Sequence, residues 1–220
     1  MANIRKWSGV AVAMQSALAT ATTITGITKA TPGVVSATHS LANGDYVIMT
    51  VQGMHQLNAR VFRVVNVVGT TTFQLEDTTT GAGIDTSAFD DFVSGTFQEI
   101  TFGTAITSAT SMSASGGDFD FIDTTTIHSN VKTQIPGSAN PITYTFDNLW
   151  DIADAGQVAM KLASDLQSQR AFKFTFGQGG PIMVFNGYVG FTGSPGGSAQ
   201  DKVISPATIT AEGSPTYYSA

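Results

Sequence analysis

Phe172-Lys173-Phe174-Thr175-Phe176 is the stretch that decides the fold, because aromatic and polar side chains alternate along it. Successive side chains of a β-strand point to opposite faces of the sheet, so this alternation predicts a strand with one aromatic face and one polar face. Ile142-Thr143-Tyr144-Thr145-Phe146 repeats the pattern, and residues 118–121 read Asp-Phe-Asp-Phe. We expect the aromatic side chains of all three stretches to face a core.

Other short apolar runs on either side are separated by turn signals. Asn43-Gly44 and Gly69-Thr70 have the residue types of tight turns, in which glycine or asparagine readily adopts positive φ. The runs predict further strands at residues 10–15, 46–51, 61–68, 72–76, 182–191 and 203–211. The fold class is therefore mainly β.

One segment, residues 154–169, has a helical period instead. Val158, Leu162 and Leu166 recur every four residues, and Asp154 and Gln157 have the spacing of a capping box. We expect one amphipathic helix that packs on the sheet through the Val158, Leu162 and Leu166 face.

Composition limits the function. Only 12% of the 220 residues are charged, about half the usual share, and the net charge is −6. The negative charge argues against binding a polyanion, since such binding depends on lysine and arginine. The absence of cysteine excludes disulfides and thiol chemistry. The N-terminal stretch makes a poor signal peptide and no run approaches the length of a membrane span, so we expect no membrane insertion.

Residues with catalytic or metal-binding chemistry are scattered. His39, His55 and His128 lack the spacing of a zinc site. The acidic run that begins at Asp118 lacks the glycine and glutamate of a calcium loop. The glycine-rich residues 177–180 lead into a strand rather than a helix, which indicates a hairpin turn and not a phosphate loop. We expect no enzyme activity, no metal site and no cofactor.

A resemblance to a known family starts at residues 119–127, Phe-Asp-Phe-Ile-Asp-Thr-Thr-Thr-Ile, followed by Lys-Thr-Gln-Ile-Pro-Gly at 132–137. This pattern resembles the tail tube proteins of long, non-contractile phage tails, in which a strand leads through a long arm to a Pro-Gly turn. The order of strand, helix, glycine-rich hairpin and closing strand over residues 100–213 is similar to that family. The resemblance implies a β-sandwich with one flanking helix.

The resemblance to tail tube proteins also implies a structural role in the virion tail. Subunits of such proteins form hexameric rings that stack into a hollow tube, through which double-stranded DNA passes without specific binding. The implied partners are other copies of the chain, the tape measure protein, the tail terminator and the distal tail or baseplate proteins, with assembly in the host cytoplasm. The arm would reach neighbouring subunits. Its candidate residues are Ile127, Ser129, Val131, Lys132, Gln134 and Pro136.

A second resemblance covers residues 24–75. It is similar to a small β-module of phage structural proteins, which resembles the half-domain that bears the first catalytic cysteine in ubiquitin-activating enzymes; without cysteine, only the scaffold is shared. We expect residues 24–99 to be a β-barrel-like insertion on the exterior of the tube, joined through a tether at 77–96. The tube domain would then comprise residues 1–23 and 100–220.

Two carboxylates are candidates for the lining of the lumen. If Phe119 and Phe121 face the core, Asp118 and Asp120 must face away from it. Carboxylates that face passing DNA would prevent adhesion. In a closed tube they lie either in the lumen or on the outer wall, where they would only add solubility. Of the two positions we favour the lumen for Asp118 and Asp120.

The main alternative is a carbohydrate-binding or surface-adhesion β-module displayed on a virion. Such modules stack sugars on exposed aromatic side chains, and Trp7 and Trp150 are the two tryptophans present. We expect Trp150 to pack in the core, just before the helix.

Overall fold

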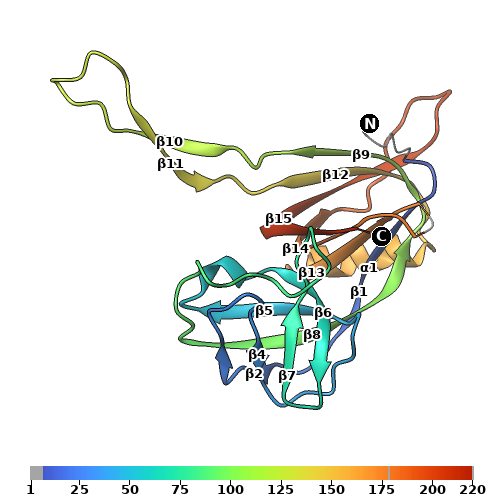
Figure 1. Ribbon diagram of the computed structural model, residues 1–220. Coiled ribbons are helices and arrows are strands. Elements are labelled where there is room, and N and C mark those ends of the chain that lie inside the picture. Colours follow the sequence, from blue (N-terminus) through green and yellow to red (C-terminus); the bar gives the residue numbers. More distant parts are fainter. Residues whose placement is uncertain (1–6, 178, 220) are drawn as a thin grey trace.

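The computed structural model describes residues 7–177 and 179–219. This part of the chain is mainly β, with one α-helix, as the sequence predicts. Most strands form one antiparallel sheet in the order β3-β4-β7-β6-β5-β8-β1-β13-β14-β15-β12-β9, with β2 paired to β8, and β10 and β11 form a separate two-stranded sheet (Figure 1). The strands are β1 (Val10–Leu18), β2 (Thr22–Thr23), β3 (Gly26–Ile27), β4 (Val35–Ser36), β5 (Tyr46–Gln52), β6 (Val61–Val68), β7 (Thr72–Leu75), β8 (Ser94–Ile106), β9 (Ala109–Ser115), β10 (Phe119–Asp123), β11 (Gln134–Ala139), β12 (Thr143–Leu149), β13 (Gln169–Phe176), β14 (Ile182–Phe191) and β15 (Ile204–Tyr218).

The sheet curls over an aromatic core. Phe146 of β12 stacks on Phe174 of β13 with ring centroids 5.8 Å apart, although β14 and β15 lie between these strands in the sheet. Phe172 and Phe174 are fully buried, and Phe185 of β14 lies against both. Lys173, between them in sequence, points away from this core and lies over the Tyr46 ring. The predicted alternation of β13 is confirmed, and it produces a β-sandwich-like layer structure.

A second core lies within the residues predicted to form the module. Met49, Leu57 and Phe73 are fully buried there, together with Phe97 of β8. β8 does not stop at the predicted joint between residues 99 and 100. Its first half pairs with β5 and its second half pairs with β1, so one strand belongs to both halves of the molecule.

The junction between the two cores is closed by Tyr218, near the end of β15. Its side chain is 1% exposed and packs in a small apolar cluster with Val61 and Val184. The Arg63 backbone N–H donates a hydrogen bond of 2.7 Å to the Tyr218 hydroxyl. The Arg63 guanidinium lies over the Tyr218 ring and donates two hydrogen bonds to the Glu76 carboxylate, which is buried.

The segment expected to be a tether is packed instead. Thr86 is 1% exposed, and its hydroxyl donates to the Thr28 carbonyl at 2.6 Å. Phe89 and Phe92 pack against the second core. The tether interpretation of residues 77–96 is therefore wrong: its threonines and aspartates satisfy local hydrogen bonds, and its two phenylalanines anchor it.

Asp77 begins this segment and stabilises its first turn. Its carboxylate accepts hydrogen bonds from the Thr79 hydroxyl and backbone N–H, with further bonds from Thr80, and these lower the pKa of Asp77 from 3.8 to about 2. A lowered pKa in the folded state means that the stabilisation is present above pH 4 and is lost as the pH falls towards 2. We expect Asp77→Ala to lower the free energy of unfolding at pH 7 by less than about 1 kcal/mol, because solvent screens this site. Thermal unfolding between pH 5 and pH 2 should show the difference from the unchanged protein disappearing near pH 2.

The helix α1 (Ala155–Asp165) packs on β14 and β8. The N-cap half of the predicted capping box is confirmed, since the Gln157 N–H donates to the Asp154 side chain at 2.8 Å. The reciprocal half is wrong, because the Gln157 side chain donates to the Leu149 carbonyl and accepts from the Asp151 N–H. The helix ends earlier than expected because Gln167 adopts a positive φ of 49°. Gly156 is needed for close packing, since a Cβ there would lie 2.8 Å from the Ala105 carbonyl oxygen. No helix in the described ranges is long and apolar enough to cross a membrane.

Candidate interaction surfaces

The most prominent surface is the hairpin β10–β11, which projects from the body of the protein (Figure 1). Phe119 and Phe121 are 54% and 63% exposed. The expectation that they face a core is wrong, because β10 pairs only with β11 and all of its residues are exposed. Alternating residues predict two faces of a strand, but they do not show whether a face is covered by the same chain.

The predicted arm coincides with the outer half of this hairpin. Its candidate residues are all exposed, with Ile127 the most exposed at 96%. Four of them lie in the tip, between the ends of β10 and β11: Ile127, Ser129, Val131 and Lys132. Gln134 and Pro136 lie on β11 itself, so the expected turn at Pro136-Gly137 is wrong. Proline is tolerated here because both strands of the hairpin are edge strands.

At the root of the hairpin, two glycines interrupt the chain between β9 and β10. Gly116 and Gly117 have φ values of +89° and +86°, which other residues rarely adopt. A Cβ on Gly116 would lie 2.3 Å from the Pro141 carbonyl oxygen. The Gly117 N–H donates to the Asn140 carbonyl at 3.1 Å and holds the two segments of the root together. The hairpin is thus joined to the sheet by two adjacent chain segments.

The two candidate lumen residues lie at this root. Asp118 and Asp120 are exposed, and the Asn140 side chain donates to the Asp120 carboxylate at 3.3 Å. Asp120 alternates with Phe119 and Phe121 as expected, but all of them are in solvent in the single chain.

A second apolar surface covers the outer side of α1. Val158, Leu162 and Leu166, expected to pack on the sheet, are 54%, 55% and 61% exposed, so that prediction is wrong. The smaller side chain of Ala163 and the flexible one of Met160 face the sheet instead. Small residues let the helix approach β14 and β8 closely, which leaves its bulkier stripe outward.

Trp150, expected in the core, lies beside this stripe. It is 41% exposed, and its indole N–H donates to the Gly193 carbonyl at 3.0 Å. A groove of about 260 Å³ runs between Trp150 and the helix, with Ile152, Val158 and Lys161 among its lining residues.

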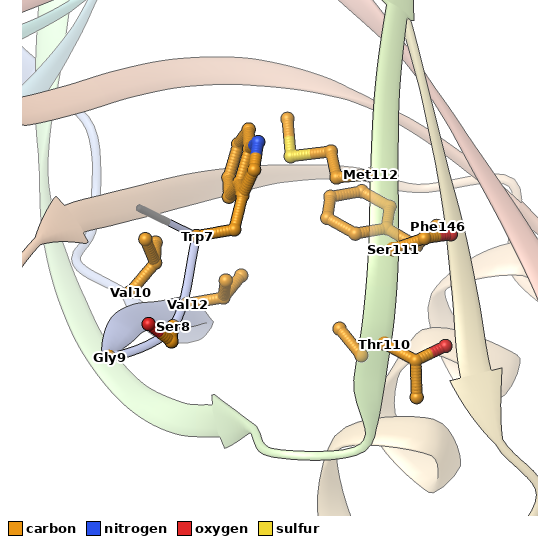
Figure 2. A pocket seen from close by; sticks show the side chains of 10 residues that line it. Trp7, Ser8, Gly9, Val10, Val12, Thr110, Ser111, Met112 and Phe146 are labelled. Carbon is orange, nitrogen blue, oxygen red and sulfur yellow. The ribbon is translucent and has the colours of Figure 1, made fainter. Parts of the chain in front are cut away.

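A third surface is the open edge of the sheet at β9. The outer side of β9 pairs with no other strand of the described chain. Beside it lies a groove of about 560 Å³, and Figure 2 shows Trp7, Val12 and Met112 among the side chains that line it. The Trp7 ring lies 5.5 Å from that of Phe176. None of the described lining residues is charged.

The candidate chemical residues are not brought together. His39 is buried and its Nδ1 accepts from the Leu41 N–H at 3.2 Å. His55 pairs with Asp90 on the surface, and His128 lies in the hairpin tip. In residues 7–177 and 179–219, no group of three side chains could hold a metal ion.

A projecting apolar hairpin, an uncovered helix face and an open sheet edge are features of a structural subunit that contacts other proteins. The chain belongs to the family of phage tail tube proteins: residues 52–220, more than half of the chain, match the family described as "Phage tail tube protein, TTP". A comparison with curated proteins finds no match. The protein is a structural component of the phage virion tail, and its family implies self-assembly into a tube with other tail proteins. Membership in this family indicates a non-enzymatic role.

Proposed function

We propose that the chain forms hexameric rings that stack into the tube of a long, non-contractile phage tail, and that this tube conducts double-stranded DNA during ejection. The observation that carries the proposal is the hairpin β10–β11. A two-stranded hairpin with both faces in water is marginally stable at best, and this one exposes Phe119, Phe121 and Ile127. Burial against a neighbouring subunit removes that exposed apolar surface from water.

The open sheet edge supports the same proposal. β9 contains no charged residue and no proline, the features by which proteins usually block pairing of an edge strand with another chain. Edge pairing between subunits would join their sheets into a continuous wall. Such a contact joins two different surfaces of identical subunits. It forms a closed ring when the rotation between successive subunits adds up to a full turn.

The proposed tube assigns roles to the hairpin, to the partner proteins and to the second core. The hairpin residues Ile127, Ser129, Val131, Lys132, Gln134 and Pro136 contact neighbouring subunits, and the tape measure protein, tail terminator and distal tail proteins are the further partners. Assembly takes place in the host cytoplasm. Residues 24–99, which contain the second core, form a module inserted into the tube domain and lie on the tube exterior.

Electron microscopy of the purified protein tests the proposal. We expect stacked rings with six-fold symmetry and an open centre, and light scattering that grows with protein concentration. A chain that stays monomeric at all concentrations, alone and with its tail partners, would contradict it.

The lumen role of Asp118 and Asp120 is a separate proposal, which is supported by their charge and exposure. We expect Asp118→Lys/Asp120→Lys to leave tubes intact and to slow DNA ejection, since lysines bind phosphates. Added salt should restore the rate by screening. Asp118→Asn/Asp120→Asn is the control, which removes the negative charges without adding positive ones. Normal ejection by tails with both lysines would show that these residues lie elsewhere.

A further inference from the structure

The apolar stripe of α1 has no partner within the described chain. Val158, Leu162 and Leu166 follow one line along the outer side of the helix, and Ile152, 79% exposed, extends it beyond the N-terminal end. A contiguous exposed apolar surface of this kind marks a site of protein contact. The groove beside Trp150 adjoins the stripe, because Ile152 and Val158 line it.

The hairpin tip has the complementary chemistry. Ile127 and Val131 are 96% and 72% exposed and stand on a narrow projection, so they can enter a groove. Lys132 is the single lysine or arginine between residues 118 and 154. The segment around α1 is acidic, with Asp151, Asp154 and Asp165 against Lys161 alone. Residues 124–133 of the tip carry Lys132 and no carboxylate, although Asp123 lies at their base, and Asp165 of the helix is already paired with Lys161. The attraction available to Lys132 is therefore to Asp151 and Asp154.

The two surfaces cannot meet within one chain. Figure 1 shows the hairpin tip and α1 on opposite sides of the molecule. If the hairpin tip of one chain binds α1 of another, identical chains make a head-to-tail contact. Contacts of this type propagate into rings or filaments.

We propose that the hairpin tip of one subunit binds the outer face of α1 in a neighbouring subunit, with Ile127 in the groove beside Trp150 and Val131 against Leu162. This inference rests on the proposed self-assembly and names the acceptor of the hairpin. The occupant of the α1 face is thus a second copy of the same chain.

Cysteine cross-linking tests the pairing cleanly, because the chain has no cysteine of its own. Two variants are mixed before assembly, one with Ile127→Cys and the other with Ile152→Cys, and a short bifunctional thiol reagent is applied to the assembled material. A second mixture pairs Val131→Cys with Leu162→Cys. The control mixture pairs Ile127→Cys with Val68→Cys, which lies at an exposed position of β6. A fourth mixture pairs Ile127→Cys with Thr110→Cys and tests whether the hairpin tip binds the groove beside β9 instead.

We expect cross-linked dimers in both test mixtures at a yield several-fold above the control and the Thr110→Cys mixture. Assembled tubes that give no such excess in either test mixture would overturn the inference while leaving the proposed function intact. Preferential linkage of Ile127→Cys to Thr110→Cys would also overturn it. If the unmodified chain forms no assembly and neither test pair links in concentrated solution, both proposals fail.

Discussion

Excision of residues 118–139 is expected to give a folded monomer that no longer forms tubes. The Gly117 N–H donates to the Asn140 carbonyl, so these residues face each other, and a two-glycine linker between them can close a tight turn without moving β9 or β12. The excised residues contribute nothing to the two large cores, so the fold should persist. Loss of even one central apolar side chain from an interface costs about 2 kcal/mol of binding free energy. The excision removes several exposed apolar side chains. We therefore expect the protein concentration needed for assembly to rise at least about 100-fold.

Sedimentation velocity measures the assembly, and circular dichroism with thermal unfolding measures the fold. The matched control keeps the hairpin and exchanges only polar groups outside the candidate contact residues, as in Thr124→Ser/Thr126→Ser, and should assemble normally. An excised chain that still forms tubes of ordinary length would contradict the assignment of the hairpin as an assembly element.

The largest loss of stability is expected from Arg63→Met. Glu76 is 3% exposed, and its carboxylate accepts two hydrogen bonds from the Arg63 guanidinium. The hydrogen bond to Glu76 is also the main reason that the pKa of Arg63 is raised. Removal of the guanidinium leaves a buried charge without a partner, which costs about 3–5 kcal/mol. For a chain of this size, the melting temperature should fall by roughly 10 °C.

Two comparisons isolate the cause. The double variant Arg63→Met/Glu76→Leu should recover much of the loss, because no unpaired charge remains. Lys161→Met breaks the exposed pair between Lys161 and Asp165 and should cost at most about 0.5 kcal/mol. Equal losses from Arg63→Met and Lys161→Met would show that the buried pair has no special role at the junction.

Strand positions were predictable where apolar side chains alternate or run together. The observed bounds of β6 and β14 equal the predicted ones, and β13 differs only at its start. β8 was missed because threonines, glycines and a Gln-Glu pair separate its five apolar residues, so neither an apolar run nor a regular alternation spans its thirteen residues. Its position depends on pairing with β5 and β1, which are distant in sequence, and no local pattern reveals such pairing.

The candidate surfaces were harder to predict for one physical reason. An apolar stripe looks the same in sequence whether it faces the chain's own core or another subunit. Leu162 and Phe121 were therefore assigned to the core, although both are exposed. A useful signal was present in the small residues: Gly156 and Ala163 mark the close-packed side of the helix, opposite the bulky stripe. Residues 127–136, expected to form an arm, lie exposed in the outer part of the projecting hairpin, and their contact with neighbouring subunits stays a prediction.

The pairing of β1 with β13 has a consequence for the timing of folding. The Ala171 N–H donates to the Gln15 side chain across 156 residues of sequence, so the centre of the sheet requires closure of a very long loop. Hairpins such as β6–β7 and β10–β11 involve neighbouring segments and form within microseconds. The sheet centre on which α1 packs is therefore expected to be completed late in folding, after local hairpins such as β6–β7 have formed.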